Sequence, residues 1–157
     1  FGGLGPPSGV AETENWNGTC WSEVADLNTA RRSNAGNGTN SNAGAWGGYV
    51  SGNVANTEIW NGTSWTEVAD QSNAGGGASF GVYNDALKTS GSGNVVELWN
   101  GTAWSSGTNA SDSKSNRGGL GTTSAGLLIG GEPPGTGVVN TEEWVAPTTS
   151  TVTFTAS

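Results

Sequence analysis

One phrase recurs along this chain of 157 residues and constrains its fold more than any other feature. Three versions of it align without gaps: TENWNGTCWSEVAD (13–26), TEIWNGTSWTEVAD (57–70) and VELWNGTAWSSGTN (96–109). A fourth segment, TEEW (141–144), matches the start of the phrase. The first tryptophan of each version falls at position 16, 60, 99 or 144, so the spacings are 44, 39 and 45 residues. A repeat of this length indicates a chain built from similar supersecondary units.

Two other segments precede each phrase. One is an apolar stretch that ends in Gly-Gly: FGG (1–3), WGGYV (46–50) and LLIGGE (127–132), with a weaker SFGVY (79–83) that lacks the Gly-Gly at 81–82. The other, further upstream, is rich in small residues: 31–44, 71–80 and 116–126. Small side chains suit a strand at a crowded centre, and Asn-Gly favours a tight hairpin turn. Each unit therefore predicts four short strands.

The composition agrees with an all-β fold. Eight tryptophans, Thr/Val segments and Gly/Asn turns are typical of strands and hairpins, and no segment has the apolar periodicity of a helix. Four antiparallel strands in a unit of about 40–50 residues are the signature of a β-propeller blade. We therefore expect a small β-propeller. A stacked β-solenoid is the alternative, although its repeats are usually shorter.

The chain is expected to form a single β-propeller domain over 1–157. Its units are expected at roughly 1–30, 31–70, 71–110 and 111–157. Phe1 aligns with Trp46 and Ile129, so the first unit enters at its second strand. The alternating segment TSTVTFTAS (149–157) reads as a strand. It either forms the outer strand of the fourth unit or supplies the missing strand of the first and closes the ring.

Four repeated tryptophans predict a ring of about four blades. Two alternatives remain open. The chain could be a segment of a larger propeller, or an arc that a second copy of the chain completes in a homo-oligomer.

The order of these segments resembles a known family. WGG followed by a variable loop and TEIWNGTSW, at 46–65, resembles the kelch repeat, whose blades are four-stranded. The resemblance covers nearly the whole chain. It departs from the pattern at 81–82 and in the last unit, which lacks the second tryptophan. The Asn/Thr/Gly-rich wording also resembles kelch-like repeats of tail fibres and tail-associated proteins of marine bacteriophages, which implies a viral structural protein in the virion or outside the cell.

Charge and residue types argue against several function classes. The net charge is −8 with only five Lys and Arg, whereas nucleic-acid binding depends on clustered cations. No apolar run reaches the roughly eighteen residues of a membrane span. The chain has no histidine and one cysteine, Cys20, so a site built on His or Cys ligands is excluded. We expect no cofactor, no metal, no nucleic acid and no membrane insertion.

The repeated tryptophans and glutamates are expected to be structural. Tryptophans that flank a hairpin can pack across strands and between blades; a surface tryptophan that stacks on a sugar is the alternative. A glutamate two residues before a tryptophan shares its face of a strand. It can accept backbone hydrogen bonds or pair with Arg31, Arg32 or Arg117. The repeat residues are Trp16, Trp21, Trp60, Trp65, Trp99, Trp104, Trp144, Glu14, Glu58, Glu97 and Glu142.

Binding is expected in the loops that join the Gly-Gly strand to the TExW strand. These loops differ most between units and should emerge on one face, where repeat scaffolds carry their specificity. They are predicted at 4–12, 50–56, 84–96 and 132–140. The third carries the candidate ligand-binding residues Tyr83, Asp85 and Lys88.

These features predict a non-enzymatic structural and recognition module. It would present its loops to a host surface glycan or to a neighbouring virion protein. The alternative is a propeller-type glycoside hydrolase or lyase that uses the recurring glutamates. A retaining glycosidase needs two carboxylates about 5 Å apart, and the repeat spacing shows no such pair.

Overall fold

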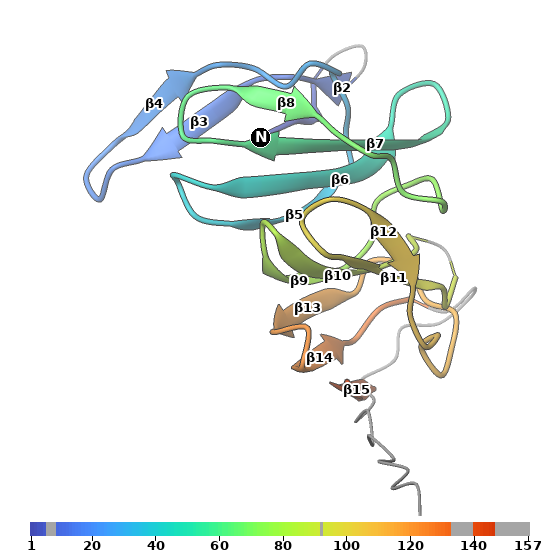
Figure 1. The fold of residues 1–157 in the computed structure, drawn as a ribbon. Coiled ribbons are helices and arrows are strands. Elements are labelled where there is room, and N and C mark those ends of the chain that lie inside the picture. Colours follow the sequence, from blue (N-terminus) through green and yellow to red (C-terminus); the bar gives the residue numbers. More distant parts are fainter. Residues whose placement is uncertain (6–8, 92, 133–139, 147–157) are drawn as a thin grey trace, which may run out of the picture.

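The computed structural model describes residues 1–5, 9–91, 93–132 and 140–146. In that part of the chain all regular secondary structure is β-strand, and the strands form a row of small antiparallel sheets (Figure 1). The strands are β1 (Gly3–Leu4), β2 (Gly9–Val10), β3 (Thr13–Trp16), β4 (Trp21–Val24), β5 (Ala35–Gly38), β6 (Ala43–Tyr49), β7 (Asn53–Trp60), β8 (Trp65–Glu67), β9 (Ser79–Val82), β10 (Asp85–Thr89), β11 (Val96–Trp99), β12 (Trp104–Ser106), β13 (Gly118–Gly121), β14 (Ala125–Ile129) and β15 (Thr141–Val145).

The sheets follow one another as propeller blades. Strands β5 to β8 form a four-stranded sheet in sequence order, and β9 to β12 form a second one. We name these blades 2 and 3. Blade 1 comprises the pairs β1–β2 and β3–β4, and blade 4 comprises β13 to β15. The repeated four-stranded antiparallel order confirms the all-β, blade-based fold predicted from the repeats.

Each repeated phrase folds into a hairpin because its Asn-Gly supplies the turn. The Asn61 side-chain oxygen accepts hydrogen bonds from the backbone N–H groups of Thr63 and Ser64, both at 2.9 Å. Gly62 has a φ of 92°, which a residue with a Cβ rarely adopts. The same turn recurs at Asn17 and Asn100.

The turn aligns the two tryptophans of each phrase across the hairpin. Trp16 lies opposite Trp21, and their ring centroids are 5.4 Å apart. The pairs Trp60/Trp65 and Trp99/Trp104 repeat this geometry at 5.4 and 5.3 Å. Cross-strand aromatic pairs of this kind stabilise a hairpin that has few other apolar groups.

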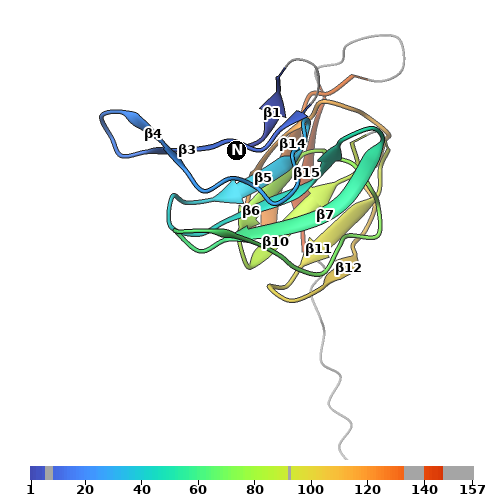
Figure 2. The same ribbon diagram turned by 90° about the horizontal axis from the view of Figure 1, so that it is seen from above.

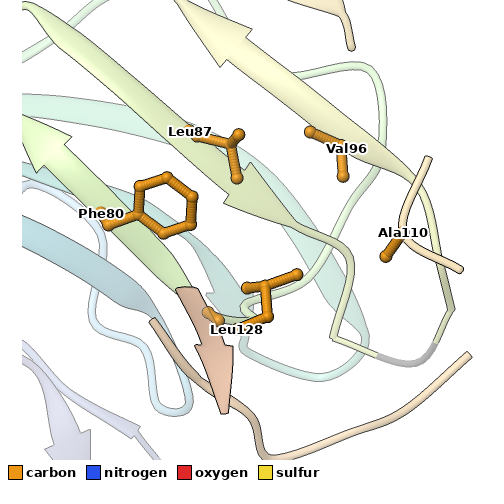
Figure 3. Packing of buried hydrophobic residues seen from close by; sticks show 6 residues of the cluster. Phe80, Leu87, Val96, Ala110 and Leu128 are labelled. Atoms are coloured by element: carbon orange, nitrogen blue, oxygen red, sulfur yellow. The ribbon is translucent and has the colours of Figure 1, made fainter. Parts of the chain in front are cut away.

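The apolar core is divided into three clusters, each between neighbouring blades. Between blades 1 and 2 lie Leu27, Ala43, Ala45, Trp60 and Trp65. Between blades 2 and 3 lie Ala35, Trp46, Ala86 and Trp99, with Ile59 and Trp104 against them. Between blades 3 and 4 lie Ala78, Phe80, Leu87, Val96, Ala110 and Leu128 (Figure 3), and Trp144 packs against this cluster. Packing between sheets therefore holds the blades in their order.

The blades form an arc. Strand β5 packs beside β9, and β9 packs beside β13, so the first strands of blades 2 to 4 line one side of the row. Blades 1 and 4 lie at opposite ends (Figure 1), and the β3–β4 hairpin projects beyond the other sheets (Figure 2). The described residues thus match an arc rather than a closed ring of four blades. The predicted strand at 149–157 lies outside the described residues.

The third unit corrects one prediction. SFGVY is not the second strand of its blade, because Ser79–Val82 is β9, the first strand. The second strand is β10, in which Ala86 faces Trp99 just as Ala43 of β6 faces Trp60. The predicted loop 84–96 is therefore wrong over Asp85–Thr89. The alternating Phe80-Gly81-Val82 imitates an apolar second strand, which explains the error.

Candidate functional site

The repeated glutamates of blades 2 to 4 hold the linker that enters each blade. Glu58, on β7, accepts a hydrogen bond from the backbone N–H of Asn28 at 2.7 Å and pairs with Arg31 at 2.8 Å. Neither Glu58 nor Arg31 exposes its side chain to solvent. Burial lowers the pKa of Arg31, while the charge of Glu58 opposes that shift. Glu58 makes both kinds of contact that its place in the repeat predicts.

Blade 3 builds the same arrangement from other residues. Glu97 accepts hydrogen bonds from the backbone N–H groups of Ser72 and Asn73 at 2.8 and 3.1 Å. Lys88 lies opposite Glu97 across β10 and β11, is 1% exposed and donates a hydrogen bond to the Asn73 carbonyl at 3.2 Å. Burial lowers the pKa of Lys88 to about 8, against the opposing charge of Glu97.

In blade 4, Glu142 accepts hydrogen bonds from the backbone N–H and the hydroxyl of Ser111 at 2.7 and 2.8 Å, and Arg117 lies 3.7 Å away. Glu14 of blade 1 is exposed, and no hydrogen bond or ion pair of its side chain occurs in the described part of the chain. The three buried or partly buried glutamates are thus engaged in the architecture. Each is held by its own linker.

The indole N–H groups of the first tryptophans anchor the turn between the first and second strands of their own blade. Trp60 donates to the Asn40 carbonyl at 2.9 Å, Trp99 to the Tyr83 carbonyl at 3.1 Å and Trp144 to the Thr123 carbonyl at 2.8 Å. Most of the repeated tryptophans are buried or partly buried. Trp16 and Trp21 differ, because they are 44% and 63% exposed.

The structure does not bring Tyr83, Asp85 and Lys88 together in a loop site. Tyr83 and Asp85 flank the β9–β10 turn, at the end of the blade opposite to the expected binding loops. Asp85 accepts a hydrogen bond from the Thr123 hydroxyl of blade 4 at 2.7 Å. Lys88 lies inside the blade. Their placement on the loop face was wrong because 85–89 pairs with both neighbouring strands.

A hollow of about 570 Å³ lies on the expected loop face, where first strands begin and second strands end. We name it the central hollow. Its lining comes from blades 2 to 4: Arg32, Ser33, Asn34, Gly48, Tyr49, Asn53, Gly75, Gly76, Gly77, Gly91, Asn116 and Arg117. The lining contains two arginines, an aromatic ring and three amide side chains, and no carboxylate. It is therefore a polar, cationic concavity on a chain whose net charge is −8.

The polar groups of the central hollow are held in place by the backbone. The Arg32 guanidinium stacks 4.5 Å from the centre of the Tyr49 ring, and Arg32 and Tyr49 exchange two backbone hydrogen bonds at 2.8 and 3.1 Å. Arg117 is tied instead to Asp112. Among the described residues no ion pair involves Arg32, so its charge remains available to a ligand.

Glycine lets the blades approach at the floor of the central hollow. A Cβ on Gly76 would stand 1.7 Å from the Ser33 carbonyl oxygen, so no other residue fits there without a backbone shift. Ser33 and Asn116 have positive φ values of 55° and 53° where the linkers enter blades 2 and 4. Left-handed residues other than glycine are uncommon and often mark functional positions.

The sequence predicted the face of this site but not its residues. Arg32 and Asn34 belong to the small-residue stretch at 31–44, which is expected to form a strand, and Arg32 is otherwise expected only as one candidate partner of a repeated glutamate. A charged pair, Arg31-Arg32, inside such a stretch was the available signal. One arginine enters the core and the next enters the hollow.

Other kinds of site find no support in the described residues. They contain no group of three or more His, Cys, Asp or Glu side chains that could hold a metal ion. No helix among them is long and apolar enough to cross a membrane.

Comparison with known proteins identifies the class of fold. No family model matches the sequence, and no curated protein matches it. Among solved structures, the chain is similar to that of YjhT, a kelch-repeat β-propeller protein, with a TM-score of 0.67 and 10% identity. The match covers 83% of this chain and 55% of the YjhT chain. The protein thus has a kelch-like β-propeller fold. It spans just over half the length of the propeller protein that it matches.

Proposed function

We propose that this protein is a non-enzymatic recognition module that binds a surface glycan in the central hollow. The observation that carries the proposal is Arg32, which stacks on Tyr49 at the hollow and forms no ion pair within the described residues. A guanidinium, an aromatic ring and amide side chains together match the hydroxyl groups and apolar ring faces of a sugar.

The recurring carboxylates support binding rather than hydrolysis. Glu58 is fully buried and Glu97 is 4% exposed, and both are occupied by backbone N–H groups. Among the described residues that line the central hollow there is no carboxylate. Acid–base hydrolysis of a glycoside needs two accessible carboxyl groups across one bond, so the hydrolase or lyase alternative is the weaker proposal.

The setting that we propose is the outside of a virion or cell, in a tail fibre or a tail-associated protein. The support is the Asn/Thr/Gly-rich composition of the repeats, which resembles that of such tail proteins. A neighbouring virion protein is the other partner that such a rigid face would fit, through the exposed loops around the central hollow.

A glycan array with the intact chain tests the proposal. We expect selective binding that Arg32→Ala and Tyr49→Ala abolish. Tyr83→Ala is the matched control, because Tyr83 lies at the other end of the blades and should leave binding unchanged. Absence of binding across a broad panel of bacterial and algal glycans would overturn glycan recognition. Release of reducing ends from any polysaccharide would overturn the non-enzymatic assignment.

A further inference from the structure

A tryptophan contact joins successive blades and repeats with the same geometry. The Trp65 indole of blade 2 donates to the Thr13 hydroxyl of blade 1 at 3.0 Å, and its ring packs edge-on against Phe1 at 4.8 Å. The Trp104 indole of blade 3 donates to the Thr57 hydroxyl of blade 2 at 2.9 Å. Its ring packs edge-on against Trp46 at 5.3 Å.

Each such tryptophan therefore meets two receptor positions on the blade before it. One is the threonine three residues ahead of that blade's first tryptophan, and the other is the large apolar residue that directly precedes the Gly-Gly of the repeat, Phe1 in blade 1 and Trp46 in blade 2. Thr57 and Trp46 face each other across β6 and β7, which fixes the two positions as neighbours.

Blade 3 lacks both receptors, and the following blade lacks the tryptophan. The receptor positions in blade 3 are Val96 and Thr89, which also face each other across their strands. In blade 4 the position of the second tryptophan holds Thr149, which lies outside the described residues. Receptors and tryptophan are thus present together or absent together at all three junctions between the blades.

Blade 4 has both receptors again, although no blade follows it among the described residues. Thr141 and Ile129 are partners across β14 and β15. Both are exposed, Ile129 by 40%, and the same face presents Leu120 and Val145 with 52% and 63% exposure. This outer face of blade 4 is largely apolar, with a threonine acceptor at its edge, and it also carries the exposed Glu143, which pairs with Leu127.

Blade 1 presents the complementary surface. Trp21 is the second tryptophan of its hairpin and is 63% exposed, and its indole N–H has no hydrogen-bond acceptor within the described residues. Trp16 and Glu14 are exposed on the same hairpin. A groove of about 320 Å³ beside these side chains also includes Trp60 and Trp65, so it belongs to the junction of blades 1 and 2. One end of the arc therefore has the tryptophan without receptors, and the other end has the receptors without a tryptophan.

We propose that the two ends bind each other between two copies of this chain, with Trp21 of one copy packing on Ile129 of the other and donating to its Thr141. The contact continues the blade-to-blade interface already present twice in the molecule. The arc matches 55% of the YjhT chain, which leaves room in one ring for a second copy joined head to tail at both ends. The proposal is independent of glycan binding.

Sedimentation velocity of the intact chain tests the proposal in a Cys20→Ser background, because exposed Cys20 could otherwise cross-link copies. We expect a concentration-dependent dimer between about 1 µM and 1 mM. Trp21→Ser and Ile129→Asp should each give a monomer, although they alter opposite ends of the arc. Thr141→Val should weaken dimerisation about tenfold through the lost hydrogen bond.

Val82→Asp is the matched control, since Val82 is 51% exposed outside both end surfaces and should leave the dimer intact. Circular dichroism checks that every variant is folded. A chain that stays monomeric throughout this range would overturn the proposal. So would a dimer that survives both Trp21→Ser and Ile129→Asp.

Discussion

Arg31 and Glu58 form an ion pair of 2.8 Å in which neither side chain is exposed to solvent. Glu58 also accepts hydrogen bonds from the linker at Asn28, whereas Arg31 keeps a buried Nε without a hydrogen-bond partner in the described structure. The two partners are therefore unequally satisfied. The Glu58 carboxylate binds both the linker and Arg31, whereas the Arg31 guanidinium leaves one of its N–H groups without an acceptor.

This inequality predicts an order of stabilities. Glu58→Leu should cost about 3–5 kcal/mol, because it leaves a buried guanidinium and a linker N–H without partners. Arg31→Met should cost less, since Glu58 keeps its backbone donors. Glu14→Leu, at the exposed equivalent in blade 1, should change stability by less than about 0.5 kcal/mol. Urea denaturation of the three variants measures the order, and a larger loss for Arg31→Met than for Glu58→Leu would contradict it.

The buried Lys88 predicts that the free energy of unfolding rises as the pH becomes alkaline. Its pKa falls from 10.5 to about 8 on folding because the charged amine is desolvated. Below pH 8 both states are protonated and the cost of burial is complete. Between pH 8 and 10.5 the folded state releases a proton that the unfolded state keeps, so stability rises with pH by at most about 3 kcal/mol.

Denaturant unfolding of the wild type and of Lys88→Met, at a series of pH values, isolates this effect. Other titrating groups change the unfolding free energy of both proteins equally, so their contributions cancel in the difference. The difference in unfolding free energy should shift in favour of the wild type across that window. A difference that stays constant with pH would show that Lys88 does not titrate there.

The bond from Trp104 to Thr57 crosses a blade junction. Thr57→Val keeps the shape of the side chain and removes the acceptor, which leaves a partly buried indole N–H unpaired. We expect a loss of about 1–2 kcal/mol in thermal or chemical unfolding. Thr66→Val, on an exposed strand position of the same blade, should be neutral. Equal effects of the two substitutions would rule out a specific contribution from the bond.

The Asn61 side chain organises the turn between Trp60 and Trp65. Asn61→Ala removes two hydrogen bonds to backbone N–H groups and should cost about 0.5–1.5 kcal/mol. Asn109→Ala is the matched control, because Asn109 is exposed and lies in no strand. Differential scanning calorimetry compares the two variants. If Asn109→Ala were the more damaging, the turn would not depend on its asparagine.

The repeat predicted the hairpins and the blade architecture because local chemistry decides them. Asn-Gly forces the turn, and the flanking tryptophans then face each other whatever surrounds them. Glu58 was also accessible to prediction, since a strand places it on the same face as Trp60. These features depend on residues that are near one another in the sequence.

Other features depend on contacts between distant segments. Lys88 looks like a surface residue, and only Glu97 and the Asn73 carbonyl, supplied by other segments, allow it to be buried. Arg32 belongs to the central hollow only because Tyr49 and the linkers of three blades converge there. Arg31-Arg32 stands out in the sequence, but nothing local indicates this convergence, so the hollow was missed. The loop site was misplaced for a different reason, because Phe80-Gly81-Val82 imitates the second strand of a blade.

Each of the three apolar clusters takes its side chains from two neighbouring blades. Each blade is therefore a repeating unit, and each cluster is the apolar interface between two such units. Duplicating one unit adds one apolar interface and leaves the other interfaces unchanged, provided that the tryptophan and its receptor residues match at the new junction. The length of such a protein can change in evolution by whole units, while the existing junctions keep their own contacts.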